Sequence, residues 1–171
     1  MKILKIIGAL VLVLLLIPVI YLGAMRFADG PSDIVAGGPF KTGELTPAPD
    51  DWTFLKGRAE IEFQSLDPAV SRVVWLGVLD SRLYVISGYM NTFTGKIWKH
   101  WPRQLEADDR VILRIDGKLY EQRMERLMSH PNLLGLMEIY KEKYGAGLAS
   151  PDQLNQALEN GDFWLYEVVD R

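Results

Sequence analysis

The chain opens with an uninterrupted apolar segment. Residues 6–25 contain no charged side chain and consist mostly of Leu, Ile, Val and Ala. At about 1.5 Å per residue, a helix of this length spans roughly 30 Å, the thickness of a bilayer's hydrocarbon core. A cleaved signal peptide is the alternative, but its apolar region is shorter, and Leu22 stands where its cleavage site needs a small residue. We therefore expect residues 1–25 to be an uncleaved transmembrane anchor.

The charges that flank this segment predict its orientation. Lys2, Lys5 and the amino terminus precede it, whereas Arg26 follows it together with Asp29 and Asp33. Positively charged flanks remain on the cytoplasmic side of a membrane. We therefore expect a cytoplasmic N-terminus and an extracytoplasmic domain.

The segment that follows the anchor differs in composition from the rest of the chain. Residues 26–50 are rich in Gly and Pro and poor in large apolar side chains. Such a segment buries too little surface to offset the entropy of ordering it. We expect a flexible tether over residues 26–50 and a folded domain over residues 51–171.

The first half of the domain has the apolar pattern of strands. Apolar and polar residues alternate over residues 59–64, which is typical of a strand with one solvated face. Residues 73–79 are almost continuously apolar, which indicates a strand buried on both sides. Asp80-Ser81 separates this run from another at residues 83–86, so the two runs predict a hairpin.

A short helical segment is expected after the third strand. Ile97, Trp98, Trp101 and Leu105 are spaced as on one helical face. Pro102 disfavours helix at the residue before it but suits the first position of a helix. We therefore expect a short turn ending at Trp101 and then a helix that begins with Pro102.

The second half of the domain predicts a hairpin, two helices and a final strand. Asp116-Gly117 suits a two-residue hairpin turn because Gly tolerates positive φ. Gly145 and Gly147 are expected to end the first helix, and Ser150 with Gln153 forms a capping box for the second. The hairpin strands are expected at residues 111–115 and 118–128, the two helices at residues 131–144 and 150–160, and the final strand at residues 163–169. The domain then has six strands, a helical segment after the third, and two helices before the sixth.

Composition excludes several kinds of function. Without Lys2 and Lys5, the 19 basic residues become 17 against 22 acidic residues, a net charge of -5, which argues against nucleic acid as a partner. There is no cysteine, so disulfides, thiolate metal sites and cysteine nucleophiles are excluded. The two histidines, His100 and His130, have no second ligand at a metal-binding spacing, so we expect no metal.

Two stretches carry a resemblance to a known group of proteins: LGVLDSRLYVISG at residues 76–88 and GKIWKHWPRQLEADDRVILRIDGKLYEQRMERL at residues 95–127. They resemble the split β-barrel proteins of the pyridoxamine-phosphate-oxidase and deazaflavin-dependent nitroreductase group. Gln104-Leu105 and Asp108-Asp109 stand where that group has Asn-Leu and Asp-Pro. The resemblance implies an α+β fold, a six-stranded Greek-key split barrel with peripheral helices.

The resemblance also implies a cofactor, FMN or a deazaflavin, bound in a groove between the subunits of a homodimer. Carried over by position, the residues that contact the phosphate would be Ser87, Lys96, Lys99 and Arg103. The residues that shape the ring pocket would be Trp98, His100 and Trp101, with His100 as the one candidate catalytic acid. The same residue types also fit a solvated basic face and tryptophans in the core, and this alternative stays open.

Two hypotheses for the function follow. The first is a membrane-anchored, flavin-binding oxidoreductase-like protein, with a membrane quinone as a conceivable electron partner. The second is a non-catalytic extracytoplasmic binding module that keeps the barrel without the cofactor chemistry. The expected orientation favours the second hypothesis, because reduced nicotinamide is not readily supplied outside the cytoplasm.

Overall fold

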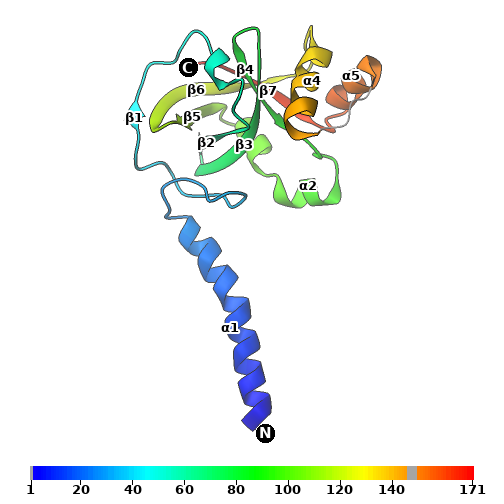
Figure 1. Ribbon diagram of the computed structural model, residues 1–171. Coiled ribbons are helices and arrows are strands. Elements are labelled where there is room, and N and C mark those ends of the chain that lie inside the picture. The colour runs from blue at the N-terminus through cyan, green and yellow to red at the C-terminus, as the bar shows by residue number, and fades with distance from the viewer. Residues whose placement is uncertain (1, 146–149) are drawn as a thin grey trace.

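The computed structural model describes residues 2–145 and 150–171, with the side chains of Leu4 and Trp98 left out. In chain order the elements are α1 (Lys2–Met25), β1 (Glu44–Leu45), a 3₁₀ turn η1 (Thr53–Leu55), β2 (Glu60–Leu66), β3 (Ala69–Leu79), β4 (Arg82–Ser87), α2 (Phe93–Trp98), α3 (Trp101–Leu105), β5 (Arg110–Ile115), β6 (Lys118–Leu127), α4 (Leu133–Tyr144), α5 (Pro151–Glu159) and β7 (Trp164–Asp170) (Figure 1). The predicted order of six strands and three helical segments is confirmed.

Strands β2 to β7 form a closed antiparallel barrel. Neighbouring strands follow the order β2, β3, β4, β7, β6 and β5, and β5 pairs again with β2. Every pairing among these six strands is antiparallel. The expected α+β fold with a six-stranded barrel is therefore confirmed. Strand β1, which the sequence pattern did not predict, adds a short parallel pairing at the start of β6.

Alternation along the strands fills the barrel interior. Val74, Leu76 and Val78 of β3 face inward and join a core with side chains from the other strands. Both predicted hairpin turns are confirmed. Asp80 and Ser81 have φ values of 48° and 65°, and the turn between β5 and β6 likewise has positive φ at both of its residues. Positive φ at two successive residues matches the right-handed twist of the flanking strands.

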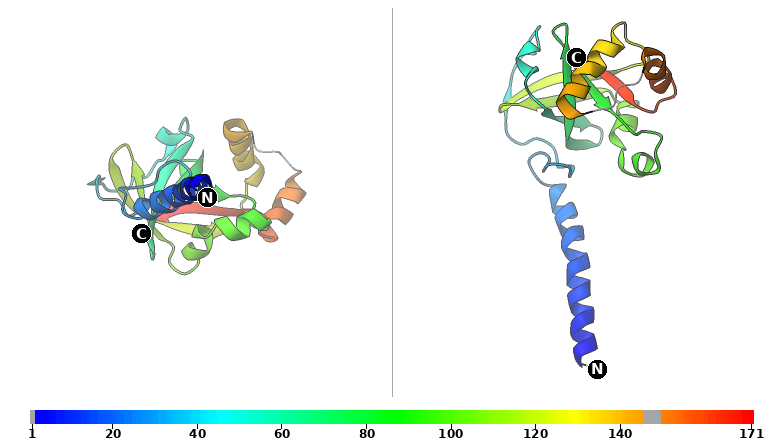
Figure 2. Two further views of the ribbon diagram at one scale, coloured as in Figure 1. Left: turned by 90° about the horizontal axis from the view of Figure 1, so that it is seen from below. Right: turned by 45° about the vertical axis from the view of Figure 1, so that its right-hand side comes forward.

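Helices α4 and α5 cover the outer face of β3, β4 and β7 (Figure 2). Tyr140 of α4 is fully buried there and donates a hydrogen bond to the carbonyl oxygen of Tyr84 at 2.9 Å. The predicted capping box of Ser150 and Gln153 is present at the start of α5. Gly145 ends α4 with φ 67°, as predicted, while Gly147 lies outside the described residues.

The helical segment after β4 is divided into α2 and α3. Helix α2 ends at Trp98, and α3 begins at Trp101, so that Pro102 is its second residue. The predicted break is confirmed, although the second helix starts one residue earlier than expected. Trp101 is 7% exposed, and its ring lies 5.2 Å from the ring of Phe63 and 5.4 Å from that of Tyr166. Helix α3 thus contributes directly to the barrel core.

The segment between α1 and the barrel lies against the barrel wall. The amide of Gly37 donates to the carbonyl of Ser71 at 3.0 Å, and the Ser71 amide donates back at 3.1 Å. The Arg114 guanidinium binds Asp29 at 2.8 Å and Glu62 at 2.6 Å. The boundaries of the tether at residues 26 and 50 stay a prediction, but the part that precedes β1 makes specific contacts with the barrel.

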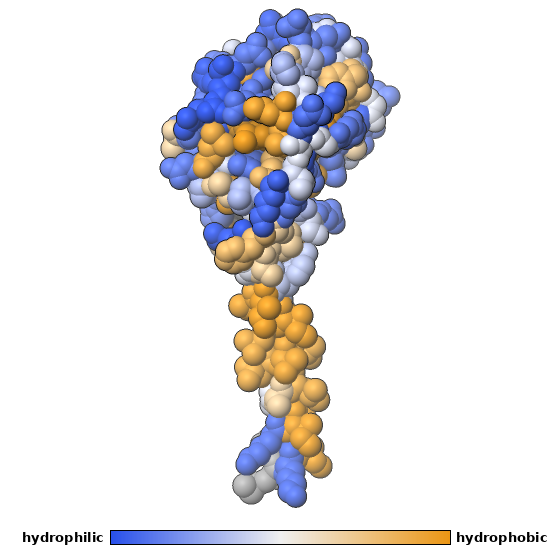
Figure 3. All heavy atoms as spheres, turned by 90° about the vertical axis from the view of Figure 1, so that its left-hand side faces the viewer, coloured by the Kyte–Doolittle hydropathy of each residue, from blue (hydrophilic) through white to orange (hydrophobic). Residues whose placement is uncertain are grey.

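Helix α1 extends away from the barrel (Figures 1 and 2). Its surface is hydrophobic along most of its length, with hydrophilic side chains near the N-terminus (Figure 3). Residues Lys5–Met25 are long and apolar enough to cross a membrane, and apart from Met25 the large apolar side chains of this stretch are exposed in the structure. An N-terminal signal sequence has the same properties.

Candidate functional site

One hollow with a mostly apolar lining lies beside β3, the end of β4 and α4, and we call it the large cleft. Its volume is about 620 Å³. The walls come from β3, the end of β4, the loop after β4, the first residue of α3, and α4. The cleft combines residues that are distant in the sequence, because barrel closure and the packing of α4 bring these elements together.

Two partly buried cations line the large cleft. Burial lowers the pKa of the Arg72 guanidinium and that of the Lys99 ammonium group. The Lys99 Nζ donates a hydrogen bond to the carbonyl oxygen of Gly88 at 2.6 Å. The Nε of Arg72 is buried and has no hydrogen-bond partner among the described residues. Neither side chain forms an ion pair with a described carboxylate, so both suit an anionic ligand.

Aromatic side chains form much of the remaining wall. Trp75 stacks on Tyr144 with ring centroids 4.4 Å apart and an interplanar angle of 4°. Trp75 is 45% exposed and Tyr89 is 73% exposed, whereas Trp101 is buried. All four side chains line the cleft. A planar ligand could therefore contact aromatic faces there while the cations contact an anionic group.

Acidic side chains are also present around the large cleft. Asp33, Glu60 and Asp162 line it. The Asp162 carboxylate accepts a hydrogen bond from the side-chain amide of Asn91 at 2.8 Å. The ligand chemistry of the cleft therefore depends on the local positions of Arg72 and Lys99 rather than on an excess of positive charge.

The residues predicted from the sequence are only partly brought together. Ser87, Lys99 and Trp101 line the large cleft. Ser87 is buried, and its hydroxyl donates to the sulfur of Met90 at 3.3 Å. His100 lines a different cleft, described below.

The remaining predicted residues lie elsewhere. Lys96 and Arg103 are exposed and line neither cleft, and the side chain of Trp98 lies outside the described part of the chain. The proposed roles of all these residues in cofactor binding stay predictions.

Arg72 was missed by the reasoning from sequence. Arg72 lies an even number of residues from Val74, Leu76 and Val78 along β3, so it is on the strand face that points into the barrel. A charged residue at an inward position of a strand is the pattern that could have singled it out, because buried charges are rare without a partner.

The second cleft lies where α1 meets the barrel, and we call it the base cleft. Its volume is about 400 Å³, and Arg72 forms part of its wall as well. The other lining residues come from the end of α1, the segment after it, β3 and its preceding turn, and the α2–α3 region: Leu22, Arg26, Val35, Ala36, Gly37, Pro68, Val70, Ile97, His100 and Gln104.

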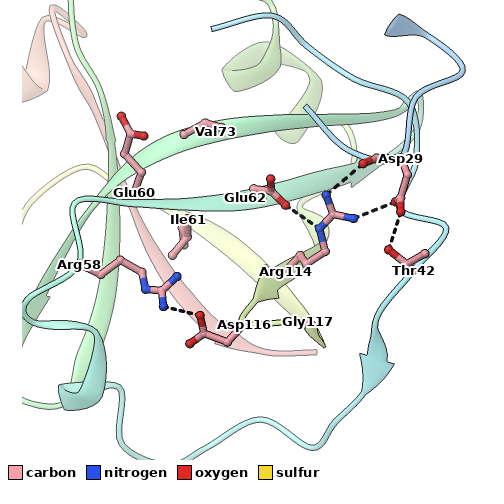
Figure 4. Close-up of a pocket in the computed structure, with 10 residues that line it drawn as sticks. All are labelled: Asp29, Thr42, Arg58, Glu60, Ile61, Glu62, Val73, Arg114, Asp116 and Gly117. Atoms are coloured by element: carbon pink, nitrogen blue, oxygen red, sulfur yellow. Dashed lines mark hydrogen bonds and ion pairs between the residues drawn. The ribbon is translucent and has the colours of Figure 1, made fainter. Parts of the chain in front are cut away.

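A third hollow, lined by β2 and the β5–β6 turn, is occupied by ion pairs of the chain itself (Figure 4). Arg114 lies between Glu62 and Asp29, and Arg58 pairs with Asp116 at 2.6 Å. Because these cations already have carboxylate partners, the hollow is better explained as a structural contact than as a ligand site.

Comparison with known proteins gives only distant structural likenesses. No family model matches the chain, and no curated protein matches it. A conserved hypothetical protein, Rv2991, from Mycobacterium tuberculosis is 14% identical with a TM-score of 0.47, covering 74% of this chain and 86% of that one. A putative pyridoxamine 5'-phosphate oxidase from Listeria innocua is 13% identical with a TM-score of 0.42, covering 67% of this chain and 86% of that one. A protein described as an F420 reductase is 14% identical with a TM-score of 0.37, covering 72% of this chain and 96% of that one.

The last two descriptions name the kinds of protein that the sequence resembles. At these identities and TM-scores, the likenesses carry no argument about ligand or activity. The cleft geometry of the chain itself must therefore indicate what it binds.

Proposed function

We propose that the protein is a membrane-anchored, flavin-binding oxidoreductase-like protein whose cofactor occupies the large cleft. The observation that carries this proposal is the combination of two cations without carboxylate partners, Arg72 and Lys99, with an aromatic wall. A flavin phosphate needs cationic donors, and an isoalloxazine ring needs a flat apolar surface.

The residues present fit such a cofactor. The volume of about 620 Å³ lies within the range of roughly 300–1,000 Å³ that is usual for small-molecule sites. Arg72 and Lys99 would hold the phosphate, and Trp75 and Trp101 would contact the ring. The single bond from Lys99 to Gly88 leaves two of its three N–H donors for a ligand. When bound, a flavin or deazaflavin supplies hydride or electron transfer.

Membrane anchoring is the second part of the proposal. Helix α1 is long and apolar enough to span a bilayer, and most of its large apolar side chains are exposed in the described structure. The protein should therefore stay with membranes after extraction at alkaline pH. A reporter fused to the C-terminus should be active on the extracytoplasmic side, as the flanking charges predict.

The third part is a homodimer. Trp75 and Tyr89 leave large aromatic surfaces exposed at the rim of the large cleft. A second subunit that covered this rim would exclude water from the cofactor and bury both rings. Light scattering of the full-length protein in detergent micelles, corrected for the detergent, should give the mass of two chains.

A binding module without chemistry is the second candidate, and one observation favours it. Neither histidine lines the large cleft: His100 lines the base cleft, and His130 lies 3.2 Å from the hydroxyl of Tyr84. Among the described lining residues, therefore, no imidazole is available for proton transfer near neutral pH.

Titration of the full-length protein with FMN, followed by quenching of flavin fluorescence, tests the proposal. Lys99→Gln and Arg72→Gln should each weaken FMN binding about tenfold, because each removes one charged phosphate contact. Lys96→Gln is the matched control, since Lys96 is exposed and lies outside the cleft. An equal loss in Lys96→Gln would favour the site predicted from the sequence over the cleft.

The absence of any saturable binding would rule out FMN, and the same titration would then be made with a deazaflavin. If neither bound, the binding-module hypothesis would replace the flavin hypothesis. If FMN bound but was not reoxidised by any quinone or nitro compound after chemical reduction, the site would bind a flavin without serving as an oxidoreductase.

A further inference from the structure

The base cleft lies at the level where a membrane-spanning α1 would leave the bilayer. The apolar stretch Lys5–Met25 contains 21 residues, which as a helix measures about 32 Å and matches the hydrocarbon core. Leu22 and Arg26, at the end of this stretch, line the cleft. Residues at this depth lie among lipid headgroups. The barrel side of the cleft is therefore presented to the membrane interface.

The charge of the base cleft favours an anion. Arg26, Arg72 and His100 are the titratable side chains among its lining residues, and no carboxylate lines it. Arg26 forms neither an ion pair nor a side-chain hydrogen bond with any described residue. Two arginines in one hollow without an acidic partner repel each other unless an anion lies between them.

Two of the residues that line the same hollow each have a buried polar atom without a partner among the described residues. Within the described part of the chain, the Nε of Arg72 and the Oε1 of Gln104 are the buried side-chain atoms that lack any hydrogen bond. Leaving such an atom unpaired costs about 1–3 kcal/mol. The Gln104 amide can present its oxygen or, turned about its last bond, its NH₂ group. A ligand with phosphate oxygens could accept hydrogen bonds from the terminal NH₂ groups of the Arg72 guanidinium and from the NH₂ group of the Gln104 amide.

The surroundings of the cleft are apolar on the side of α1. Ile97 lines the cleft and is 56% exposed, and Ile34, next to the lining residue Val35, is 78% exposed. Phe27 directly follows Arg26 and is 78% exposed. Helix α2 and the segment after α1 lie on the face of the barrel from which α1 departs (Figures 1 and 2). Exposed apolar side chains beside a cationic hollow are what an amphiphile requires.

We propose that the base cleft binds the phosphate of an anionic phospholipid from the leaflet next to the barrel. Arg26, Arg72 and Gln104 donate to the phosphate oxygens, and the acyl chains lie along α1 beside Leu22. This inference rests on the membrane anchor of the proposed function but not on flavin binding, because Arg26 and Gln104 do not line the large cleft. The lipid site and the proposed flavin site share only Arg72.

Native mass spectrometry of the full-length protein, released from detergent micelles, tests the proposal. Phosphatidylglycerol and phosphatidylcholine with identical acyl chains are added at equal concentration. The wild-type protein should retain phosphatidylglycerol about tenfold more than phosphatidylcholine. Arg26→Gln and Gln104→Leu should each reduce this preference several-fold, because the first removes a positive charge and the second removes an amide that can donate a hydrogen bond. Lys56→Gln, an exposed basic residue outside the cleft, should leave it unchanged.

Equal retention of the two lipids, or a preference that both variants keep, would overturn the proposal. If millimolar glycerol phosphate or inorganic phosphate displaced phosphatidylglycerol completely, the proposal would also be overturned, since the site would then bind soluble phosphate. FMN titration of Arg26→Gln and Gln104→Leu in detergent without added lipid should give the wild-type result. Loss of membrane association would be a failure of the proposed anchor, and loss of FMN binding would be a failure of the flavin site.

Discussion

The contact between Asp29 and Arg114 should decide whether the segment after α1 stays attached to the barrel. The Arg114 Nη1 lies 2.8 Å from the Asp29 carboxylate, and the guanidinium lies 4.3 Å from the ring centroid of Phe40. Asp29 also accepts hydrogen bonds from the Lys41 amide at 2.7 Å and from the hydroxyl of Thr42. One carboxylate therefore connects both ends of this segment to the barrel wall.

The magnitude of this contact follows from the Asp29 pKa. The Lys41 amide first, then the Thr42 hydroxyl and the Arg114 guanidinium, lower the pKa of Asp29 from 3.8 to about 2. A difference of this size corresponds to at most about 2.5 kcal/mol. Because the Asp29 side chain is 29% exposed, solvent screening reduces the expected value to about 1–2 kcal/mol.

The substitution that tests this contact is Asp29→Asn, which removes the charge but keeps an oxygen for the Lys41 amide. Hydrogen exchange of the amides that attach the segment, those of Gly37 and Glu44, should become about 5–30-fold faster at neutral pH. Asp50→Asn is the control, because Asp50 is exposed and forms no described side-chain hydrogen bond.

The dependence on pH gives a second readout. Docking lowers the Asp29 pKa, so the docked segment is stabilised above pH 3.8, and this stabilisation is lost as the pH falls towards about 2. Protection factors, corrected for the intrinsic rate, should fall over this range in the wild-type protein and stay flat in Asp29→Asn. If the variant kept wild-type protection at neutral pH, the carboxylate would not hold the segment. If these amides were unprotected in the wild-type protein, the flexible tether predicted from the sequence would be correct.

Three further substitutions test the packing of the helices on the barrel, each by thermal unfolding of the full-length protein. Gly77→Ala would place a methyl group 2.9 Å from the Tyr140 ring and should cost about 1–3 kcal/mol, whereas Gly57→Ala, with no atom nearby, should be close to neutral. Tyr144→Phe keeps the stacked ring but removes the hydroxyl that accepts from the Leu76 amide and donates to the Leu76 carbonyl of β3, at a cost of about 1–3 kcal/mol. Ser150→Ala removes the capping box of α5 and should cost about 1 kcal/mol.

Much of the fold could be predicted because its elements depend on local patterns. The alternation at residues 59–64 and the turn at Asp116-Gly117 specify a strand and a hairpin from a few adjacent residues. Closure of the strands into a barrel could be predicted only from the resemblance to a known group of proteins. The pairings of β7 with β4 and with β6 join strands that are far apart in the chain, and no local pattern encodes them. The two-residue strand β1 is too short to have a period.

The candidate site was predicted less well, because it depends on side-chain direction. Lys96 and Lys99 are three residues apart and looked equivalent in the sequence, yet Lys96 is exposed while Lys99 lies against Gly88. The difference arises where α2 ends, since Lys99 has left helical geometry with ψ 80°. To predict that Arg72 lines a cleft, one would need to know which face of β3 points into the barrel and which helix covers the other face.

Arg72 connects the two clefts in a way that follows from its position near the start of β3. Arg72 lines both the large cleft and the base cleft, and its Nε has no hydrogen-bond partner among the described residues. A single guanidinium has donors enough for two anions, but its charge can neutralise only one of them fully. An anion in one cleft must therefore weaken the attraction of Arg72 for an anion in the other. If both proposed sites are occupied, Arg72 is the one lining residue through which the membrane interface and the cofactor site would be coupled.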